Sequence, residues 1–246
     1  LDTLRGFYHF VSDTVPRGLE RVPPRKHQAN LFCQDGVPLV SKVSVASQGG
    51  TDLAAAVARS VELLGGLGRM VRPGQTVLVK PNFNSPDPFP GSTDPLFLEA
   101  VVRLLQQAEA KVTVGESSGG LWRPTRHVAA KVGLPALMAR LGVEFIAFDD
   151  RPRDWVRVET GGDYLPEVVI PRSVYEADLL VSLPCLKTHN LARFSASLKL
   201  GMGMIHPGQR RGMHASHLEE KIAEINLACQ PDLIIMDGRK SFVTGG

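Results

Sequence analysis

The sequence predicts an α/β fold, in which helices flank a largely parallel sheet in a Rossmann-like arrangement of three layers. Two observations carry this prediction. From Lys42 onward, short runs rich in β-branched residues alternate with segments of helical character, which is the order of elements in chains that build parallel sheets. The predicted strands also read as continuous apolar runs, because a parallel strand is buried on both of its faces.

The first part of the chain lacks this regularity. The segment "VPRGLERVPPRKHQANLF" is rich in Pro and Arg and shows no sustained period. We therefore expect an extended, irregular N-terminal arm over residues 1–40, with a short helix at 4–11, followed by one α/β domain over residues 41–246. Because the chain begins with Leu1 rather than Met, we also expect processing or truncation at one or both ends, including the C-terminus.

Local patterns predict the individual elements in order. Apolar, β-branched runs predict strands over residues 42–46, 76–80, 111–115, 144–148, 167–170, 178–183 and 232–236. Runs of helical character cover residues 51–64, 94–108, 125–133 and 134–142. Thr51 and Asp94 are the expected N-caps of the first two helices. Pro95 suits a first helical position, because its missing N–H needs no partner there.

The composition argues against several classes of protein. The formal net charge of +3 comes without a long Lys/Arg run, so we expect no nucleic-acid partner. The three cysteines form no C-x-x-C pair, so we expect neither a zinc ribbon nor a cysteine-ligated cluster within the chain. No apolar run reaches the roughly 18 residues of a membrane helix, so we expect no membrane span. We expect a cytoplasmic location, with export after removal of a signal as the alternative.

Polar residues gather where the predicted strands end. In open parallel sheets, ligands bind outside the carboxyl ends of the strands, so these residues predict a pocket at that edge. The residues are Lys80, Pro81 and Asn82; Gly115, Glu116, Ser117, Ser118, Gly119 and Gly120; Asp149 and Asp150; Cys185, Lys187, Thr188 and His189; and Asp237 with Gly238. We expect residues 184–217 to form the largest wall of the pocket, and Lys80, Glu116 and His189 to approach one cleft.

Two of the strand ends predict binding of a small anionic ligand. Lys80 and Asn82 are candidates for holding an anionic or carbonyl group, and the alternative is a proline-stiffened loop with a solvated lysine. The segment "GESSGG" offers a concave set of backbone amides suited to phosphate or carboxylate. Its binding residues would be Ser117, Ser118 and Gly119, and the alternative is a flexible turn between strand and helix.

The segment "CLKTHN" is the most specific local signal, because Lys, Thr and His follow a buried strand within three residues. We predict that Lys187 clamps an oxyanion, that Thr188 contacts the ligand, and that His189 acts as a general base or as a metal ligand. Glu116 is a further candidate acid, base or metal ligand. The alternative is that Thr188 caps a turn and that Lys187 is exposed.

Four histidines are candidate metal ligands. His189, His206, His214 and His217 together would suit a divalent metal, zinc or iron. His214 and His217 are spaced i, i+3, so both would face one side of a helix if a helix begins there. The alternative is a Gly-rich loop with solvated histidines.

The loop over residues 201–212 predicts a cover for the cleft. It holds four glycines and one proline in twelve residues, which disfavours helix and strand alike, so we expect it to be mobile. Its Arg210 and Arg211 would bring positive charge to an anionic ligand when it closes. The alternative is a surface loop whose arginines face the solvent.

Several motifs resemble those of a known family. In order and at similar spacing, "VLVKPN", "VTVGESSGG", "LVSLPCLKTH", "SLKLGMGM" and "DLIIMDG" resemble the domain of unknown function 362, over roughly residues 42–246. The resemblance implies that the recurrent polar positions of the family are here Lys80, Lys187, His189 and Lys199. Members often carry or associate with ferredoxin-like 4Fe-4S modules. Because this chain has no cysteine-rich segment, the resemblance implies a ferredoxin-like partner and no cluster of its own.

Two hypotheses about function follow. In the first, the protein is a metal-assisted enzyme that acts on a small anion, with Lys80, Lys187 and Lys199 as charge clamps and His189 as acid or base. In the second, it is a non-catalytic redox-accessory or cofactor-carrying protein that docks an iron–sulphur partner. A closed pocket with a perturbed pKa at His189 or Lys187 would favour the first, whereas an open, flat basic face would favour the second.

Overall fold

The main sheet is parallel throughout and lies between the other layers of the fold. The computed structural model describes residues 14–26, 30–45, 53–119, 123–151, 153–189 and 191–242. Five strands form the main sheet in the order β12–β9–β4–β5–β6, and every neighbouring pair is parallel. They are β4 (Thr76–Lys80), β5 (Lys111–Glu116), β6 (Glu144–Ala147), β9 (Leu179–Ser182) and β12 (Leu233–Ile234). The predicted α/β fold is confirmed.

The strand order creates a switch point beside β4. From β4 the chain adds β5 and β6 on one side, and it then crosses to place β9 and β12 on the other side. Lys80 at the end of β4 lies opposite Ser182 at the end of β9. The connections that follow these two strands run over opposite faces of the sheet, and a ligand crevice forms at such a point in open α/β sheets.

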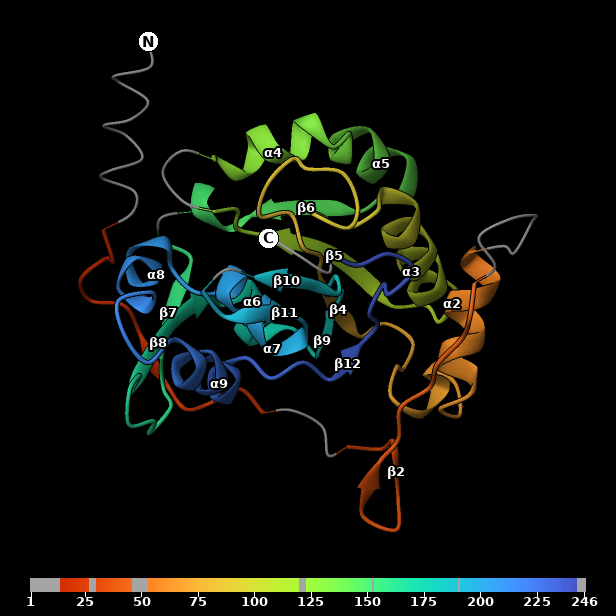
Figure 1. Ribbon diagram of the computed structural model, residues 1–246, viewed down its shortest axis with the longest axis horizontal. Coiled ribbons are helices and arrows are strands. Elements are labelled where there is room, and N and C mark those ends of the chain that lie inside the picture. Colours follow the sequence, from red (N-terminus) through yellow and green to blue (C-terminus); the bar gives the residue numbers. More distant parts are fainter. Residues whose placement is uncertain are drawn as a thin grey trace.

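Helices cover one face of the sheet (Figure 1). They are α2 (Leu53–Glu62), α3 (Pro95–Gln107), α4 (Thr125–Lys131) and α5 (Leu134–Leu141). Val79 of β4 points into this layer and shares its apolar core with Leu98 of α3. Helix α3 begins as predicted, because Asp94 accepts a hydrogen bond from the Leu96 N–H and Pro95 takes the first helical position.

A smaller sheet and further helices cover the other face (Figure 1). The small sheet has the order β1–β7–β8, formed by β1 (Arg21–Val22), β7 (Trp155–Glu159) and β8 (Glu167–Pro171). The helices are α6 (Arg172–Glu176), α7 (Ser197–Leu200), α8 (Pro207–Met213) and α9 (Leu218–Ala228). Leu78, the neighbour of Val79 on β4, joins the core on this side with Trp155 and Ile225. Adjacent residues of β4 serve opposite layers because side chains alternate along a strand.

Short elements complete the described part of the chain. Two antiparallel pairs are formed by β2 (Cys33–Gln34) with β3 (Val37–Pro38) and by β10 (Lys187–His189) with β11 (Arg193–Ser195). Three turns of 3-10 helix are η1 (Leu67–Arg69), η2 (Phe148–Asp150) and η3 (Gly201–Met204). The β10–β11 pair and η3 both follow β9, and they contribute to the site described below.

The predicted strand at 42–46 is wrong for the residues that the structure describes. Residues 42–45 form no strand. The segment instead runs beside α2 (Figure 1), where the Ser41 hydroxyl donates a hydrogen bond to the Ser60 carbonyl at 2.6 Å. The helix predicted at 4–11 and the cap predicted at Thr51 lie outside the described residues.

The strand predicted at 167–170 exists but belongs to the smaller sheet. It is β8, which pairs antiparallel with β7, and Val158 lies opposite Val168 in the register. A buried apolar run predicts a strand without saying which sheet it joins. The sequence analysis did not predict β7. Because β7 and β8 pair with each other, both strands belong to the smaller sheet and not to the main sheet.

The described part of the arm is attached to the domain. Strand β1 pairs parallel with β7. Beyond it, the buried Arg25 guanidinium forms an ion pair with Asp232 at 2.9 Å and donates a hydrogen bond to the Ala177 carbonyl. The β2–β3 pair then projects away from the rest of the chain (Figure 1).

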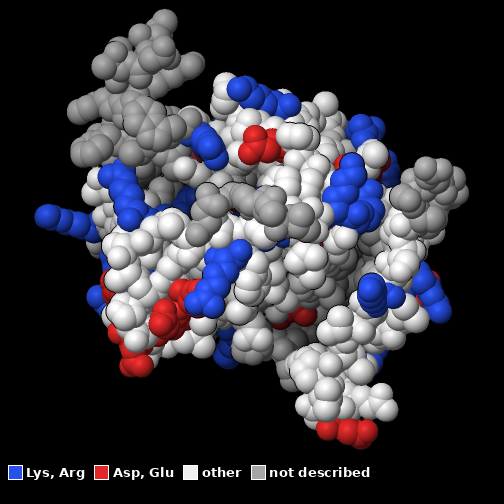
Figure 2. All heavy atoms as spheres, in the orientation of Figure 1, with Lys and Arg blue, Asp and Glu red and all other residues white. Residues whose placement is uncertain are grey.

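The surface carries basic and acidic side chains side by side. Figure 2 shows Lys and Arg in several separate groups on one face, interspersed with Asp and Glu. Among the described residues, no helix combines the length and the apolar content that crossing a membrane requires.

Candidate functional site

A pocket of about 410 Å³ lies at the carboxyl ends of the central strands. Lys80, Glu116 and His189 all line it, so the structure brings them to one cleft as the sequence predicted. The other predicted residues on its wall are Asn82, Ser117, Gly119, Lys187, Lys199, Arg210, Arg211 and His214. The wall also contains Ser195, Leu200, Met202, Gly203 and Pro207, which lie within the predicted stretch 184–217 but were not singled out one by one. The pocket lies at the switch point beside β4, where the fold favours a ligand crevice.

A buried ion pair forms the floor of the pocket. Lys80 Nζ lies 2.5 Å from Glu116 Oε1, and both side chains are at most 2% exposed. The ammonium also donates a hydrogen bond to the Pro81 carbonyl at 2.6 Å. Burial lowers the pKa of Lys80, and the Glu116 carboxylate opposes this shift. Because an ammonium has three N–H groups, the partners among the described residues leave one N–H of Lys80 to serve a molecule in the pocket.

Glu116 has its acceptor capacity engaged by the protein itself. Oε2 accepts a hydrogen bond from the Phe83 N–H at 2.7 Å, and Oε1 accepts one from the Ser117 N–H at 2.8 Å. With the Lys80 ammonium added, both oxygens have partners. Glu116 therefore acts here as a fixed counter-charge for Lys80, and this geometry gives no support to its predicted role as acid, base or metal ligand.

Gly203 closes the pocket above the ion pair. A Cβ atom on this residue would lie 2.8 Å from Lys80 Nζ and 2.9 Å from Glu116 Oε1. Cβ atoms essentially never lie this close to other atoms, so a side chain at this position of η3 would displace the Lys80–Glu116 ion pair. The motif "LKLGMGM" carried the signal in the sequence, but nothing in it revealed which buried groups the second glycine approaches.

The loop after β5 does not form the amide cradle that the sequence predicted. The Ser117 N–H donates to Glu116, the Ser118 N–H donates to Thr125 Oγ1 at 2.8 Å, and the Gly119 N–H donates to the Asn84 carbonyl at 3.2 Å. An amide that already has an acceptor inside the protein gains little from a phosphate. The prediction that these three amides bind an anion is therefore corrected.

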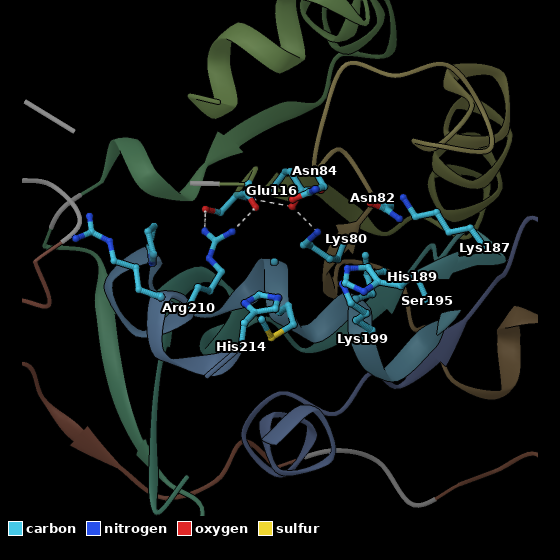
Figure 3. Close-up of a pocket in the computed structure, with 17 residues that line it drawn as sticks. Lys80, Asn82, Asn84, Glu116, Lys187, His189, Ser195, Lys199, Arg210 and His214 are labelled. Atoms are coloured by element: carbon cyan, nitrogen blue, oxygen red, sulfur yellow. Dashed lines mark hydrogen bonds and ion pairs between the residues drawn. The ribbon is translucent and has the colours of Figure 1, made fainter. Parts of the chain in front are cut away.

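Arg210 holds the same loop from the other side. Its guanidinium donates hydrogen bonds to the Ser117 carbonyl at 3.1 Å, to the Ser118 carbonyl at 2.9 Å, and to the Ser117 hydroxyl. In Figure 3, Arg210 extends from α8 toward the wall that carries Glu116. Arg210 thus joins two walls of the pocket through hydrogen bonds. Its positive charge also makes the electrostatic potential in the pocket more positive.

The β10–β11 pair places Lys187 and His189 on the opposite wall. Side chains alternate along a strand, so Lys187 and His189 face the pocket together with Ser195, while Thr188 between them does not line it. Thr188, a predicted ligand contact, therefore lies outside the pocket lining. Lys187 Nζ donates a hydrogen bond to the Gly91 carbonyl at 2.5 Å, and burial lowers its pKa.

His189 is neutral and presents a hydrogen-bond donor. Its Nδ1 accepts hydrogen bonds from the Leu191 and Ala192 N–H groups, each at 3.1 Å, so the neutral ring carries its proton on Nε2. Burial, together with the nearby Lys199, lowers the pKa of His189 to about 4. A ring with this tautomer donates from Nε2 and has no lone pair for a proton there. The arrangement favours the donor role over the predicted role as general base.

The four histidines do not come together as a metal site. His189 and His214 line the pocket. His206 is buried, where its ring packs edge-on against Trp155 at 4.6 Å between centroids, and His217 stacks on Tyr164 at 4.4 Å. In the part of the chain that the structure describes, no group of three His, Cys, Asp or Glu side chains is placed to hold a metal ion. The residues therefore do not fit the predicted zinc or iron site.

The segment 201–212 is helical, contrary to the prediction. It contains η3 and most of α8. His206 caps α8, because its Nδ1 accepts a hydrogen bond from the Gly208 N–H at 3.1 Å, and Pro207 takes the first helical position. These end contacts compensate for the low helix propensity of glycine.

Comparison with known proteins adds two findings. A family model described as "Domain of unknown function (DUF362)" matches residues 77–246, a range that contains every described residue lining the pocket. The thylakoid-associated protein sll1697 of Synechocystis sp. is 30% identical to the chain over 196 residues. That alignment covers 76% of this chain and 58% of the relative, so the chain spans little more than half of the relative's length.

Proposed function

The chain belongs to the DUF362 family, and we propose that it binds a small molecule carrying phosphate or carboxylate groups in the pocket beside β4. One observation carries this proposal, which is the charge of the pocket wall. Among the described residues that line it, the cationic side chains are Lys80, Lys187, Lys199, Arg210 and Arg211, and the one carboxylate is Glu116. The two imidazoles of the wall, His189 and His214, both have pKa values lowered by burial and add no negative charge.

The single carboxylate does not neutralise this wall. Both oxygens of Glu116 are engaged by Lys80 and by backbone N–H groups, so the carboxylate cannot turn toward the remaining cations. In a recess partly shielded from water, like charges at this density are costly, and a bound anion relieves the cost. The third N–H of Lys80 and the Nε2–H of His189 supply directed donors beside the positive charges.

The site supports an enzyme better than an accessory protein. The pocket is concave, and the pKa values of Lys187 and His189 are both lowered by burial within it. Perturbed titratable groups gathered in a cleft are typical of catalytic sites. A neutral histidine held as a donor by backbone N–H groups suits the stabilisation of a carbonyl or phosphoryl oxygen during reaction. The alternative of a flat basic docking face finds no comparable support.

Calorimetric titration of the purified chain with phosphate, pyrophosphate and citrate tests the proposal. We expect Lys187→Gln to weaken the tightest of these interactions by about 10- to 100-fold, because it removes one charged hydrogen bond. Lys131→Gln, at an exposed position of α4 away from the pocket, is the matched control and leaves the affinity unchanged. Equal affinity of the two variants, or no binding of any of the three anions, would contradict the proposal.

A further inference from the structure

We propose that Lys199 is an amine nucleophile, and that it forms an imine with a carbonyl group of the molecule bound in the pocket. The substrate class is thus a small aldehyde or ketone that carries phosphate or carboxylate. This inference rests on the proposed anion site and deepens it, because it assigns to one of the five cations a covalent role in place of a purely electrostatic one.

The first argument is that Lys199 differs from the other lysines of the pocket in its contacts. Lys80 binds Glu116 and the Pro81 carbonyl, and Lys187 binds the Gly91 carbonyl. Among the described residues, the Lys199 side chain has no partner for a hydrogen bond or ion pair. The Lys199 amine therefore need not break a hydrogen bond or an ion pair with these residues in order to react with a substrate.

The second argument is the environment of the amine. Burial, with a further contribution from Lys187, lowers the pKa of Lys199 to about 8. The titratable groups that face it are Lys187 and His189 of β10 and His214 at the end of α8, and none of them carries negative charge. An exposed lysine with a pKa near 10.4 is almost fully protonated at neutral pH, whereas this amine is partly unprotonated and nucleophilic.

The third argument is the donor beside the amine. Figure 3 shows the Lys199 and His189 side chains next to each other on one wall, and the charge of Lys199 acts on the pKa of His189. The Leu191 and Ala192 N–H groups fix the His189 ring with its Nε2–H outward. A carbonyl oxygen that accepts from Nε2 would be polarised while its carbon faces the amine.

The step that these groups support is balanced without any further reactant. The amine nitrogen of Lys199 attacks the carbonyl carbon, the carbonyl oxygen takes up a proton, and the nitrogen loses one, which gives a carbinolamine. Departure of the hydroxyl group as water then leaves the imine. Amine and carbonyl become imine and water with no change in oxidation state. The cationic side chains of Lys80 and Lys187, which line the same pocket, hold the anionic group so that the carbonyl remains at the amine.

Reductive trapping with an anionic aldehyde tests this role. The purified chain is treated with pyridoxal 5′-phosphate and sodium borohydride at pH 7.5, and the modified lysines are identified by peptide mass spectrometry. We expect Lys199 to be labelled at least ~10-fold faster than the exposed Lys131 of α4, because of its lowered pKa. Inorganic phosphate should protect Lys199 and leave the labelling of Lys131 unchanged. Labelling of Lys199 no faster than that of Lys131 would overturn the inference.

A second variant separates this inference from the anion site itself. Lys199→Arg keeps a positive charge but cannot form an imine, so it should retain most of the phosphate affinity and lose the rapid labelling phase. Lys131→Arg should keep that phase. If phosphate binds to the wild-type chain but Lys199 is not trapped, the covalent role fails and the anion site stands. If phosphate neither binds nor protects, both fail.

Discussion

Gly203 and Lys80 lie so close together that a Cβ atom on residue 203 would stand 2.8 Å from Lys80 Nζ. The two residues come from opposite layers of the pocket, since Lys80 ends β4 and Gly203 belongs to η3. Their contact fixes the depth of the pocket over the Lys80–Glu116 ion pair. Because glycine has no side chain, residue 203 leaves the space that the Lys80 ammonium occupies.

We predict that Gly203→Ala destabilises the protein and weakens anion binding. Added atoms in a packed site typically cost about 1–3 kcal/mol, and here they would displace a buried ion pair. Urea unfolding and phosphate titration measure the two effects. Gly212→Ala is the matched control, because a Cβ there meets no atom within 4 Å and the residue lies in α8. If both alanine variants behave alike, the contact does not position Lys80.

Glu116→Gln should lower the free energy of unfolding by about 3–5 kcal/mol, because it leaves the Lys80 ammonium buried without its counter-charge. The amide nitrogen of glutamine also cannot accept from the Phe83 or Ser117 N–H. Glu144→Gln provides the comparison, since its ion pair with Arg151 is exposed and surface pairs contribute about 0–1 kcal/mol. Equal losses in the two variants, measured by urea unfolding, would show that Glu116 is not the counter-charge of a buried cation.

The stability of the protein should fall between pH 6.5 and pH 4 in part because of His189. The pKa of His189 is lowered from 6.5 to about 4 in the folded state. Between these two pH values, His189 therefore binds a proton in the unfolded chain but not in the folded chain, and this favours unfolding. The contribution is fully present above pH 6.5 and is lost as the pH falls toward 4. His189→Asn keeps an acceptor for the two backbone N–H groups and should flatten the loss. Parallel unfolding curves of variant and wild type across this range would refute the assignment.

Replacing Arg210 and replacing Arg211 should have different effects on the stability of the protein and on its affinity for phosphate. Arg210→Ala removes the hydrogen bonds to Ser117 and Ser118, so we expect lower stability and at least ~10-fold weaker phosphate binding. Arg211→Ala should weaken binding with a smaller change in stability, because Arg211 lines the pocket and is exposed. Thermal unfolding and calorimetry distinguish them, and identical behaviour of the two variants would remove the structural role assigned to Arg210.

The sequence was sufficient for the parallel sheet and for the edge at which the pocket forms. Buried apolar runs identify β4, β5 and β9, and the polar residue that follows each run lands at one edge because the strands are parallel. Lys80, Glu116 and His189 were placed together on this ground alone. The prediction needed only the position of each polar residue just after a strand, because the ends of parallel strands lie side by side at one edge of the sheet.

Other features depended on contacts between distant segments, which a local pattern does not contain. The amides of Ser117, Ser118 and Gly119 suggested a phosphate cradle. The Ser117 amide instead donates to the neighbouring Glu116 side chain, and the other two donate to Thr125 and Asn84, which the local pattern does not connect to this loop. Helix α8 was missed because His206, an unusual cap, compensates for its glycines. The neutral state of His189 follows from burial and from neighbouring charges, which become visible only in three dimensions.

The ion pair between Arg25 and Asp232 has a consequence for biosynthesis. The two residues are 207 positions apart, so a ribosome that has made Arg25 must add almost the whole of this sequence before its partner exists. Until then the guanidinium remains hydrated and the segment around β1 has only part of its anchorage. Contacts of such long range form late and slow the acquisition of the native state. The segment around Arg25 therefore gains this anchor only after Asp232 has emerged.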